Sequence, residues 1–272
     1  MRLAVVSSLI WLVAWLMPAD GHEDLHLRIE DLDERIAAEP SSELYMRRAD
    51  LHRRHRDWTR SLRDYAAADR LQPGLAEIRI GRALVHLERG EPAIAIETLE
   101  GWEFEPPAGA LMLKARALAQ LGMTKEADAV FTAGIGRLES QLPEHYLEHA
   151  ATLAAADPPQ PEAAVVVIDR GIAELGDLIS LHSKAFEYAR GNGDLEAALG
   201  RVRKILSSNA TSNPEWLLAE GELLTQLGQR GAARRAYQRA LESIRALSPR
   251  RRGTPAAREI EMRATAALAR LQ

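Results

Sequence analysis

The chain has 272 residues, a net charge of −4 at pH 7 and no cysteine. The lack of cysteine excludes disulfides, thiolate metal sites and a cysteine that carries a lipid. A nucleic-acid-binding protein needs a basic face to replace the counterions along the phosphate backbone, and a net acidic chain argues against this class. We therefore expect no nucleic-acid partner.

The first 21 residues have the pattern of an export signal. Arg2 precedes an apolar run from Leu3 to Met17, and the small residues Ala19 and Gly21 suit cleavage. The run is shorter than the about 20 residues that span a bilayer comfortably. We predict a signal peptide over residues 1–21, cleaved after Gly21, and export to the periplasm. In the alternative, an uncleaved leader anchors the protein in the inner membrane, and only then do we expect a membrane contact.

Residues 22–41 are expected to form an N-terminal capping helix. Apolar residues recur here at spacings of four, three and four, which places them on one helix face. These residues are Leu25, Ile29, Leu32 and Ile36. This face is predicted to pack on the helix that follows.

The stretch from Ser42 to Leu75 is the clearest structural unit of the chain. Large and small residues alternate at helical spacing on two predicted helices. This pattern is typical of two helices that cross closely, since the small residues permit the close approach and the large ones fill the gaps beside it. They are Tyr45, Ala49 and His52 on the first helix and Ser61, Tyr65 and Ala68 on the second, with Asp57-Trp58 at the turn and Pro73 at the end. This unit of about 34 residues resembles a tetratricopeptide repeat (TPR).

Five further units repeat the pattern, so residues 42–247 are predicted to be six repeats. The repeats start near residues 42, 76, 108, 143, 178 and 214. The small residue of the first helix recurs at Ala49, Ala83, Ala115, Ala150, Ala185 and Gly221. The resemblance implies an all-α, right-handed α-solenoid of about six helix-turn-helix (TPR-like) repeats with terminal capping helices.

Three segments depart from the regular pattern. Residues 101–107 end in two prolines and are expected to form a loop, with Trp102 packing into the next repeat. The proline-rich residues 156–161 are expected to protrude. Beyond Leu247, Arg250 to Arg252 are expected to be solvated, and residues 254–272 are predicted to form a C-terminal capping helix.

Two histidine patterns raise the alternative of a metal site. His22 and His26 are one helical turn apart, and cleavage after Ala19 would create an Asp20-Gly21-His22 terminus able to bind copper or nickel. The second pattern fits H-x-x-E-H, in which two histidines hold zinc and the glutamate acts as general base; its residues are His145, Glu148 and His149. His149, however, falls on a repeat position that other units fill with ordinary residues, and no third ligand stands out. We predict no metal, no cofactor and no catalytic residue.

If the repeats stack as in the family, their first helices line a concave groove. The candidate partner-binding residues at the inward positions are Met46, Arg47, Asp50, Arg53, Arg54, Met112, Arg116, His182, Phe186 and Arg190. Adaptable apolar groups flanked by charges suit an extended peptide or a partner helix better than a small polar metabolite. The family resemblance implies a non-enzymatic scaffold that binds a protein or peptide.

Overall fold

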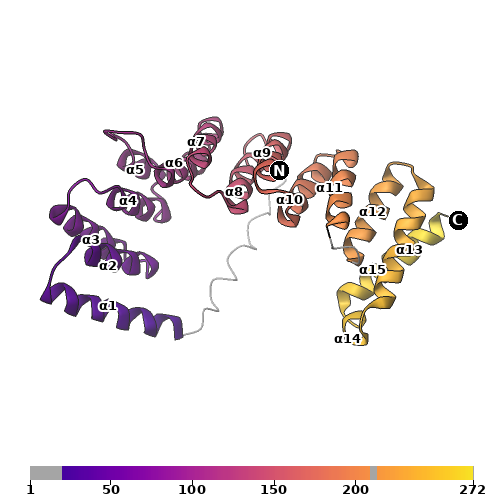
Figure 1. Cartoon of the computed structure of the whole chain (residues 1–272), viewed down its shortest axis with the longest axis horizontal. Helices are drawn as coiled ribbons and strands as arrows, with labels where there is room; N and C mark the ends of the chain where they lie inside the picture. The colour runs from indigo at the N-terminus through magenta and orange to yellow at the C-terminus, as the bar shows by residue number, and fades with distance from the viewer. Residues whose placement is uncertain (1–19, 209–212, 272) are drawn as a thin grey trace, which may run out of the picture. The chain divides into compact units, whose positions relative to one another are not determined.

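The computed structural model describes residues 20–208 and 213–271, which form fifteen helices and no strand (Figure 1). The chain divides into two compact units, one up to Leu121 and one from Gly122. The first contains α1 (Asp20–Ala38), α2 (Ser42–Arg54), α3 (Trp58–Leu71), α4 (Ala76–Glu88), α5 (Pro92–Thr98) and α6 (Ala108–Gln120). The second contains α7 (Thr124–Gly136), α8 (Pro143–Ala154), α9 (Pro161–Leu175), α10 (Ile179–Gly191), α11 (Leu195–Ser207), α12 (Pro214–Gln226), α13 (Arg230–Ala246), α14 (Pro249–Arg252) and α15 (Pro255–Arg270).

The predicted leader lies outside the described residues, apart from Asp20 and Gly21 at the start of α1. The signal peptide and its cleavage therefore stay predictions. Among the helices of residues 20–208 and 213–271, none combines the length and the apolar character needed to cross a bilayer.

Side chains at the helix starts explain several of the observed boundaries. Ser41 accepts a hydrogen bond from the backbone N of Leu44 at 3.3 Å and so caps α2. Asp57 caps α3 in the same way through the backbone N of Arg60, at 3.1 Å. These contacts satisfy backbone donors that have no partner within the helix. Proline occupies the first turn of α5, α8, α9, α12 and α15, where its missing N–H costs nothing.

Five of the six predicted repeat pairs lie within one unit each and are present as consecutive packed helices. Within the units, α2 packs on α3, α4 on α5, α8 on α9, α10 on α11 and α12 on α13. The small residue of each first helix is fully buried, including Ala49, Ala83 and Ala150. Gly221 shows why the position must be small, since a Cβ there would lie 2.6 Å from Cε1 of Tyr237. The all-α repeat architecture predicted from the sequence is confirmed.

The second repeat ends early, as its prolines predict. Its second helix, α5, stops at Thr98, and residues 99–107 continue without regular structure. Trp102 folds back over this end: its Nε1 donates a hydrogen bond to the carbonyl of Leu99 at 2.6 Å, and the ring packs on a core shared with α6. The guanidinium of Arg79 lies 4.4 Å from the centre of the Trp102 ring. Trp102 is therefore a packing residue.

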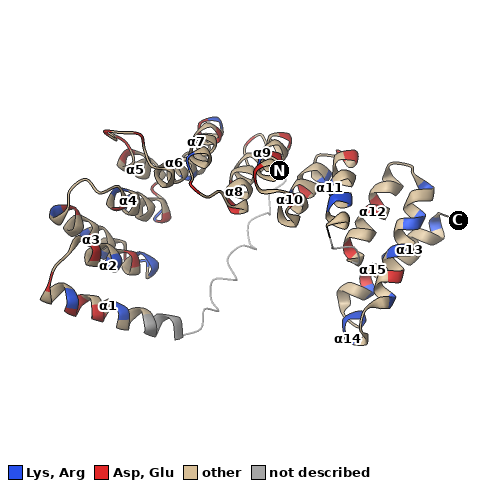
Figure 2. Cartoon of the chain, in the orientation of Figure 1, with Lys and Arg blue, Asp and Glu red and all other residues tan. Residues whose placement is uncertain are grey.

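Arg250 to Arg252 are exposed and belong to the one-turn helix α14, which appears as a basic turn beside α15 (Figure 2). The valines at 165–167 lie inside α9 and are helical. Of the segment 156–161, which was predicted to protrude, residues 157–160 are exposed, whereas Ala156 is buried and Pro161 is half-buried at the start of α9.

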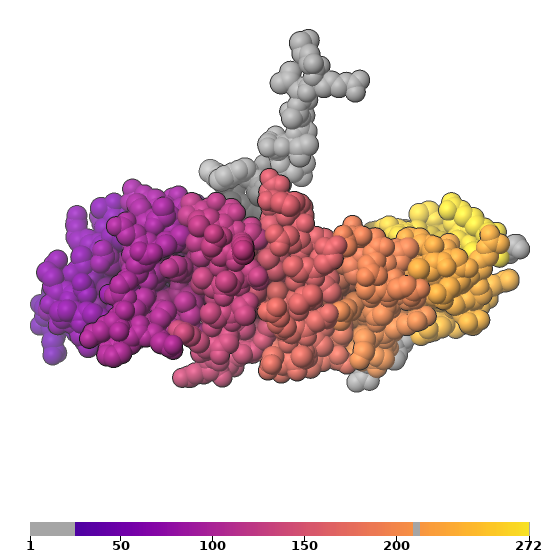
Figure 3. All heavy atoms as spheres, turned by 90° about the horizontal axis from the view of Figure 1, so that it is seen from above, coloured from indigo at the N-terminus to yellow at the C-terminus, as the bar shows by residue number. Residues whose placement is uncertain are grey.

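The two terminal helices pack as predicted for caps. Leu32 and Ile36 of α1 are buried, while Leu25 and Ile29 are half-buried. At the other end, Ala264 of α15 is fully buried in a core that α15 shares with α12 and α13. The yellow atoms near the end of the chain lie beside the orange atoms of this last repeat (Figure 3).

Candidate partner-binding groove

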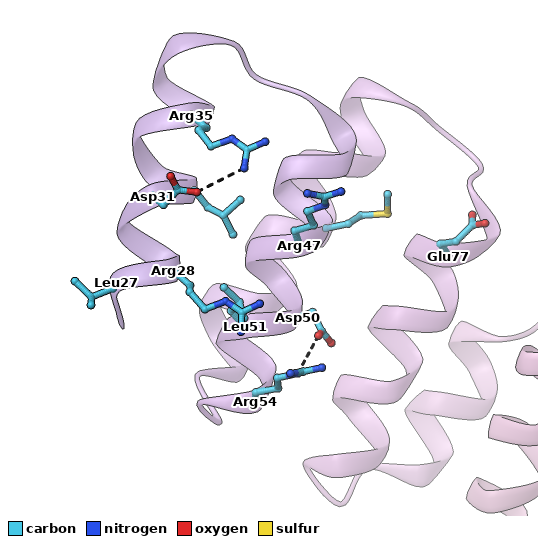
Figure 4. A pocket seen from close by; sticks show the side chains of 11 residues that line it. Leu27, Arg28, Asp31, Arg35, Arg47, Asp50, Leu51, Arg54 and Glu77 are labelled. Atoms are coloured by element: carbon cyan, nitrogen blue, oxygen red, sulfur yellow. Dashed lines mark ion pairs between the residues drawn. The ribbon is translucent and has the colours of Figure 1, made fainter. Parts of the chain in front are cut away.

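A groove of about 770 Å³ lies between α1 and α2 in the first unit. One wall is one face of α1, with side chains one helical turn apart, and the other is one face of α2 (Figure 4). The lining residues are Leu27, Arg28, Asp31, Leu32 and Arg35 of α1, Met46, Arg47, Asp50, Leu51 and Arg54 of α2, and Glu77 of α4. We call this site the α1–α2 groove.

The floor of the α1–α2 groove is apolar. Leu32 and Leu51 are buried there, and Met46 is half-buried. Leu27 stands at one edge with 63% of its surface exposed. Apolar surface left open beside a concave site is a common mark of a binding surface. An incoming apolar side chain could therefore displace water from this floor.

Charged side chains of both signs surround the apolar floor. Arg35 pairs with Asp31 at 3.5 Å along α1, and Arg54 pairs with Asp50 at 3.1 Å along α2. Both arginine side chains are more than half exposed. Exposed ion pairs contribute little to stability, so these groups can exchange their partners for those of a bound chain at small cost.

Arg53 is held differently from its neighbours. Its guanidinium contacts Asp50 at 2.6 Å and Glu88 of α4 at 2.5 Å, and only 14% of its side chain is exposed. Burial alone would lower the pKa of Arg53, but hydrogen bonds to Glu88 and Asp50 outweigh it and raise the pKa. Arg53 therefore ties α2 to α4 and does not line the groove.

Arg48 fixes the wall that α1 contributes. Its guanidinium donates two hydrogen bonds to Asp64 of α3, at 2.8 and 2.7 Å, and one to Asp33 of α1 at 2.6 Å. Hydrogen bonding to Asp64 holds the pKa of Arg48 above its usual value. One side chain thus links three helices, and α1 is positioned on the first repeat by a polar contact as well as by its apolar face.

The structure brings four of the ten predicted site residues together in the groove. Met46, Arg47, Asp50 and Arg54 line it, whereas Arg53 is not among the lining residues and pairs with Glu88 of α4. Sequence reasoning missed the α1 wall. The sequence feature that could have indicated it is Leu27, an apolar residue that does not belong to the apolar face of α1 that packs on the first repeat.

The other predicted site residues lie on α6 and α10, away from the α1–α2 groove. Met112, His182 and Phe186 are buried, so their side chains belong to the packed interior. Arg116 and Arg190 are exposed, and the guanidinium of Arg190 lies 4.9 Å from the centre of the Phe186 ring. A partner-binding role for the exposed members stays a prediction.

The two histidines of the H-x-x-E-H pattern have separate structural roles. His145 Nδ1 accepts a hydrogen bond from the backbone N of Leu142 at 3.1 Å, at the start of α8. His149 is almost completely buried, contacts Asp128 at 2.7 Å through Nε2 and stacks on Phe131. Burial lowers the pKa of His149, although Asp128 acts in the opposite direction. In the described part of the chain, no three or more histidine, aspartate or glutamate side chains are grouped to hold a metal ion.

Solved structures identify the fold. The chain is similar to the C-terminal part of a TPR repeat-containing protein from Cytophaga hutchinsonii, with 12% identity over 83% of this chain and 87% of that one and a TM-score of 0.59. The chain has the TPR fold. A second TPR-fold match is PilW, described as a widely conserved type IV pilus biogenesis factor, with 16% identity over 70% of this chain and 88% of PilW and a TM-score of 0.55.

At these identities the likeness of this TPR chain to the two proteins concerns the fold alone. No family model matches its sequence, and no curated protein does. Its function must therefore be argued from its own surface.

Proposed function

We propose that this TPR chain is a non-enzymatic scaffold that binds a partner helix or an extended peptide in the α1–α2 groove. The observation that carries the proposal is the apolar floor of Leu32, Met46 and Leu51, with the exposed Leu27 at its edge and charged side chains of two helices around it. A TPR fold by itself does not determine which ligand is bound, so we infer the class of partner from the chemistry of the groove.

The shape and chemistry of the groove favour a chain segment over a small metabolite. Its walls are two helix faces rather than loops that enclose a ligand, and the floor is apolar. An amphipathic helix laid in such a groove buries its apolar side chains on the floor and places charges against the rim. Arginines and acids of both signs on the rim would then fix the register and direction of the bound segment.

Cross-linking in cells tests this proposal. A photo-reactive amino acid replaces Met46 in the native host, and a matched control carries it at Arg63, an exposed position on α3 outside the groove. We expect a specific protein to be captured from the Met46 position and not from Arg63. Equal capture from both positions, or from Arg63 alone, would contradict the groove as the working surface.

We further propose that the scaffold works outside the cytoplasm, after cleavage of residues 1–21. The apolar run from Leu3 to Met17 supports this part of the proposal. The mass of the amino terminus in the native host tests it. Protein that starts at His22 agrees with cleavage after Gly21, and protein that keeps the leader supports the inner-membrane-anchored alternative.

A further inference from the structure

The segment from Arg230 to Arg252 concentrates positive charge in a chain that is acidic as a whole. It covers α13 and α14 and contains eight arginines and one acidic residue, Glu242. The basic residues colour α13 and α14 prominently (Figure 2). We call residues 230–252 the arginine segment.

Most arginines of the segment lack an acidic partner. Arg239 shares the buried Glu220 with Arg203, at 3.3 and 3.6 Å. The other seven form no ion pair with any acid among residues 20–208 and 213–271, and all seven are exposed; they are Arg230, Arg234, Arg235, Arg245, Arg250, Arg251 and Arg252. Elsewhere, arginines such as Arg48, Arg53 and Arg201 are engaged by acids, and exposed arginines without an ion pair in the described part of the chain, such as Arg56, Arg63 and Arg70, are spread over α2 to α3 rather than gathered in one run. The seven arginines therefore present positive charge to solvent that no ion pair within the described residues neutralises.

The outward face of α13 is polar as well as basic. Its apolar residues Ala233, Tyr237, Ala240 and Ile244 are buried, and no large apolar side chain of α13 is exposed. The neighbouring helix α15 adds exposed charges of both signs, Arg258, Glu259, Glu261, Arg263 and Arg270. Glu259 is engaged by Arg263, which also pairs with Glu222. Positive charge thus dominates the surface that α13 offers.

We infer that the arginine segment binds the headgroup surface of an anionic phospholipid membrane. A protein interface needs a desolvated apolar centre, and the outward face of α13 offers none. A plane of phosphates requires only many exposed cations over a long surface, and the 17 residues of α13 extend for about 25 Å at 1.5 Å per residue. Arginine also matches phosphate geometry better than lysine does.

The beginning of the chain supports a membrane over nucleic acid. The apolar run from Leu3 to Met17 is predicted to bring the chain to a membrane during export, whether or not it is cleaved afterwards. The arginine segment would then hold the chain at the lipid surface without insertion. This role is separate from partner binding in the α1–α2 groove, which lies in the other unit.

Co-sedimentation of the full chain with lipid vesicles tests the inference. One set of vesicles is pure phosphatidylcholine and the other contains 30 mol% of the anionic lipid phosphatidylglycerol, in about 0.1 M salt. The pure phosphatidylcholine vesicles measure whatever the apolar run at the amino terminus contributes. We expect stronger binding to the anionic vesicles, and we expect this excess to disappear at about 1 M salt because the Debye length falls to about 3 Å.

Two variants with the same loss of charge locate the effect. The test variant changes Arg234, Arg235, Arg245 and Arg251 to glutamine, and the control changes Arg56, Arg63, Arg70 and Arg89 of the first unit to glutamine. Each basic side chain near an anionic surface contributes about 1 kcal/mol, which is about fivefold in partitioning, so the loss of four arginines should weaken binding about 600-fold. The control should bind like the native chain, and both should keep the native helix content by circular dichroism.

Several outcomes would overturn the inference. Equal binding of the native chain to both kinds of vesicle would do so, as would equal losses in the test and control variants. Tighter binding of the native chain to a DNA duplex, or to polyglutamate, than to the anionic vesicles would assign the segment to nucleic acid or to an acidic protein instead.

Discussion

Arg48 of α2 and Asp64 of α3 form a bidentate pair at 2.8 and 2.7 Å inside the first repeat. The side chain of Asp64 is only 5% exposed. Because Arg48 also contacts Asp33, the same side chain holds α1 in place. The groove therefore depends on a charged pair that is itself not part of the binding surface.

Replacing Arg48 with methionine should destabilise the chain strongly. The change leaves the buried Asp64 carboxylate without its partner, and breaking a buried pair in this way costs about 3 kcal/mol. Urea unfolding measures the loss. Arg47→Met is the control, since the exposed Arg47–Glu43 pair should contribute less than about 1 kcal/mol. Similar losses in both variants would show that the Arg48 contacts do not stabilise the fold.

The same pair offers a second, independent check. Changing Arg48 to methionine and Asp64 to leucine together removes both charges, so no buried carboxylate is left unpaired. We expect the double variant to be more stable than Arg48→Met alone. A double variant as unstable as the sum of the single losses would mean that the two residues act separately.

Gly221 should not tolerate alanine. A Cβ at this position would lie 2.6 Å from Cε1 of Tyr237, a fully packed side chain, and overpacking of this kind costs about 1–3 kcal/mol. Gly200 is the matched control, because it is also helical but has nothing within 4 Å of its added Cβ. Gly200→Ala should leave the chain equally or slightly more stable. Thermal unfolding of both variants makes the comparison, and an unchanged melting temperature for Gly221→Ala would refute the close helix crossing.

Stability should fall as the pH drops through about 6.5, the usual pKa of histidine. Burial lowers the pKa of His149 in the folded chain, so the unfolded chain takes up a proton first as the pH falls. The free energy of unfolding therefore decreases with decreasing pH. Burial lowers the pKa of His52 as well, so it acts in the same direction.

Urea unfolding at pH 7.5 and pH 5.5 checks this sign. His149→Gln should reduce the difference between the two pH values, because glutamine does not titrate. A native chain that is more stable at pH 5.5 would contradict the assignment.

The repeats could be predicted from the sequence because helix crossing requires small residues at fixed positions. Ala49, Ala83, Ala115, Ala150 and Ala185 all meet this requirement and are all fully buried. The loop at residues 101–107 was predictable for a similarly local reason, since proline prevents the helix from continuing. Both features follow from residues within one repeat, so they can be predicted without knowing how the neighbouring repeat packs.

The groove was harder to predict, because exposure depends on what packs against each helix. Met46, Met112 and His182 hold the same position in their repeats, yet only Met46 is left partly exposed. The first helix of the preceding repeat packs against α6 and against α10, whereas α2 is preceded by α1 alone. The repeat pattern cannot show this difference.

The arginine segment shows a second limit of the sequence. Arg250 to Arg252 were expected to be solvated, and a run of three charges gives no reason to think otherwise. The arginines of α13 are spread along a helix, so only the structure shows that they lack acidic partners.

The most direct test of the account is the affinity of the groove for the segment that Met46 captures. A synthetic peptide of that segment is titrated into the native chain, into Leu27→Asp with Met46→Asp, and into a control with Phe104→Asp, an exposed aromatic residue outside the groove. Placing one charge on the apolar floor, at Met46, and one at its edge, at Leu27, should weaken binding by about tenfold or more, while the control binds like the native chain. Equal affinity of the native chain and the groove variant would contradict the claim that the α1–α2 groove is the partner-binding site.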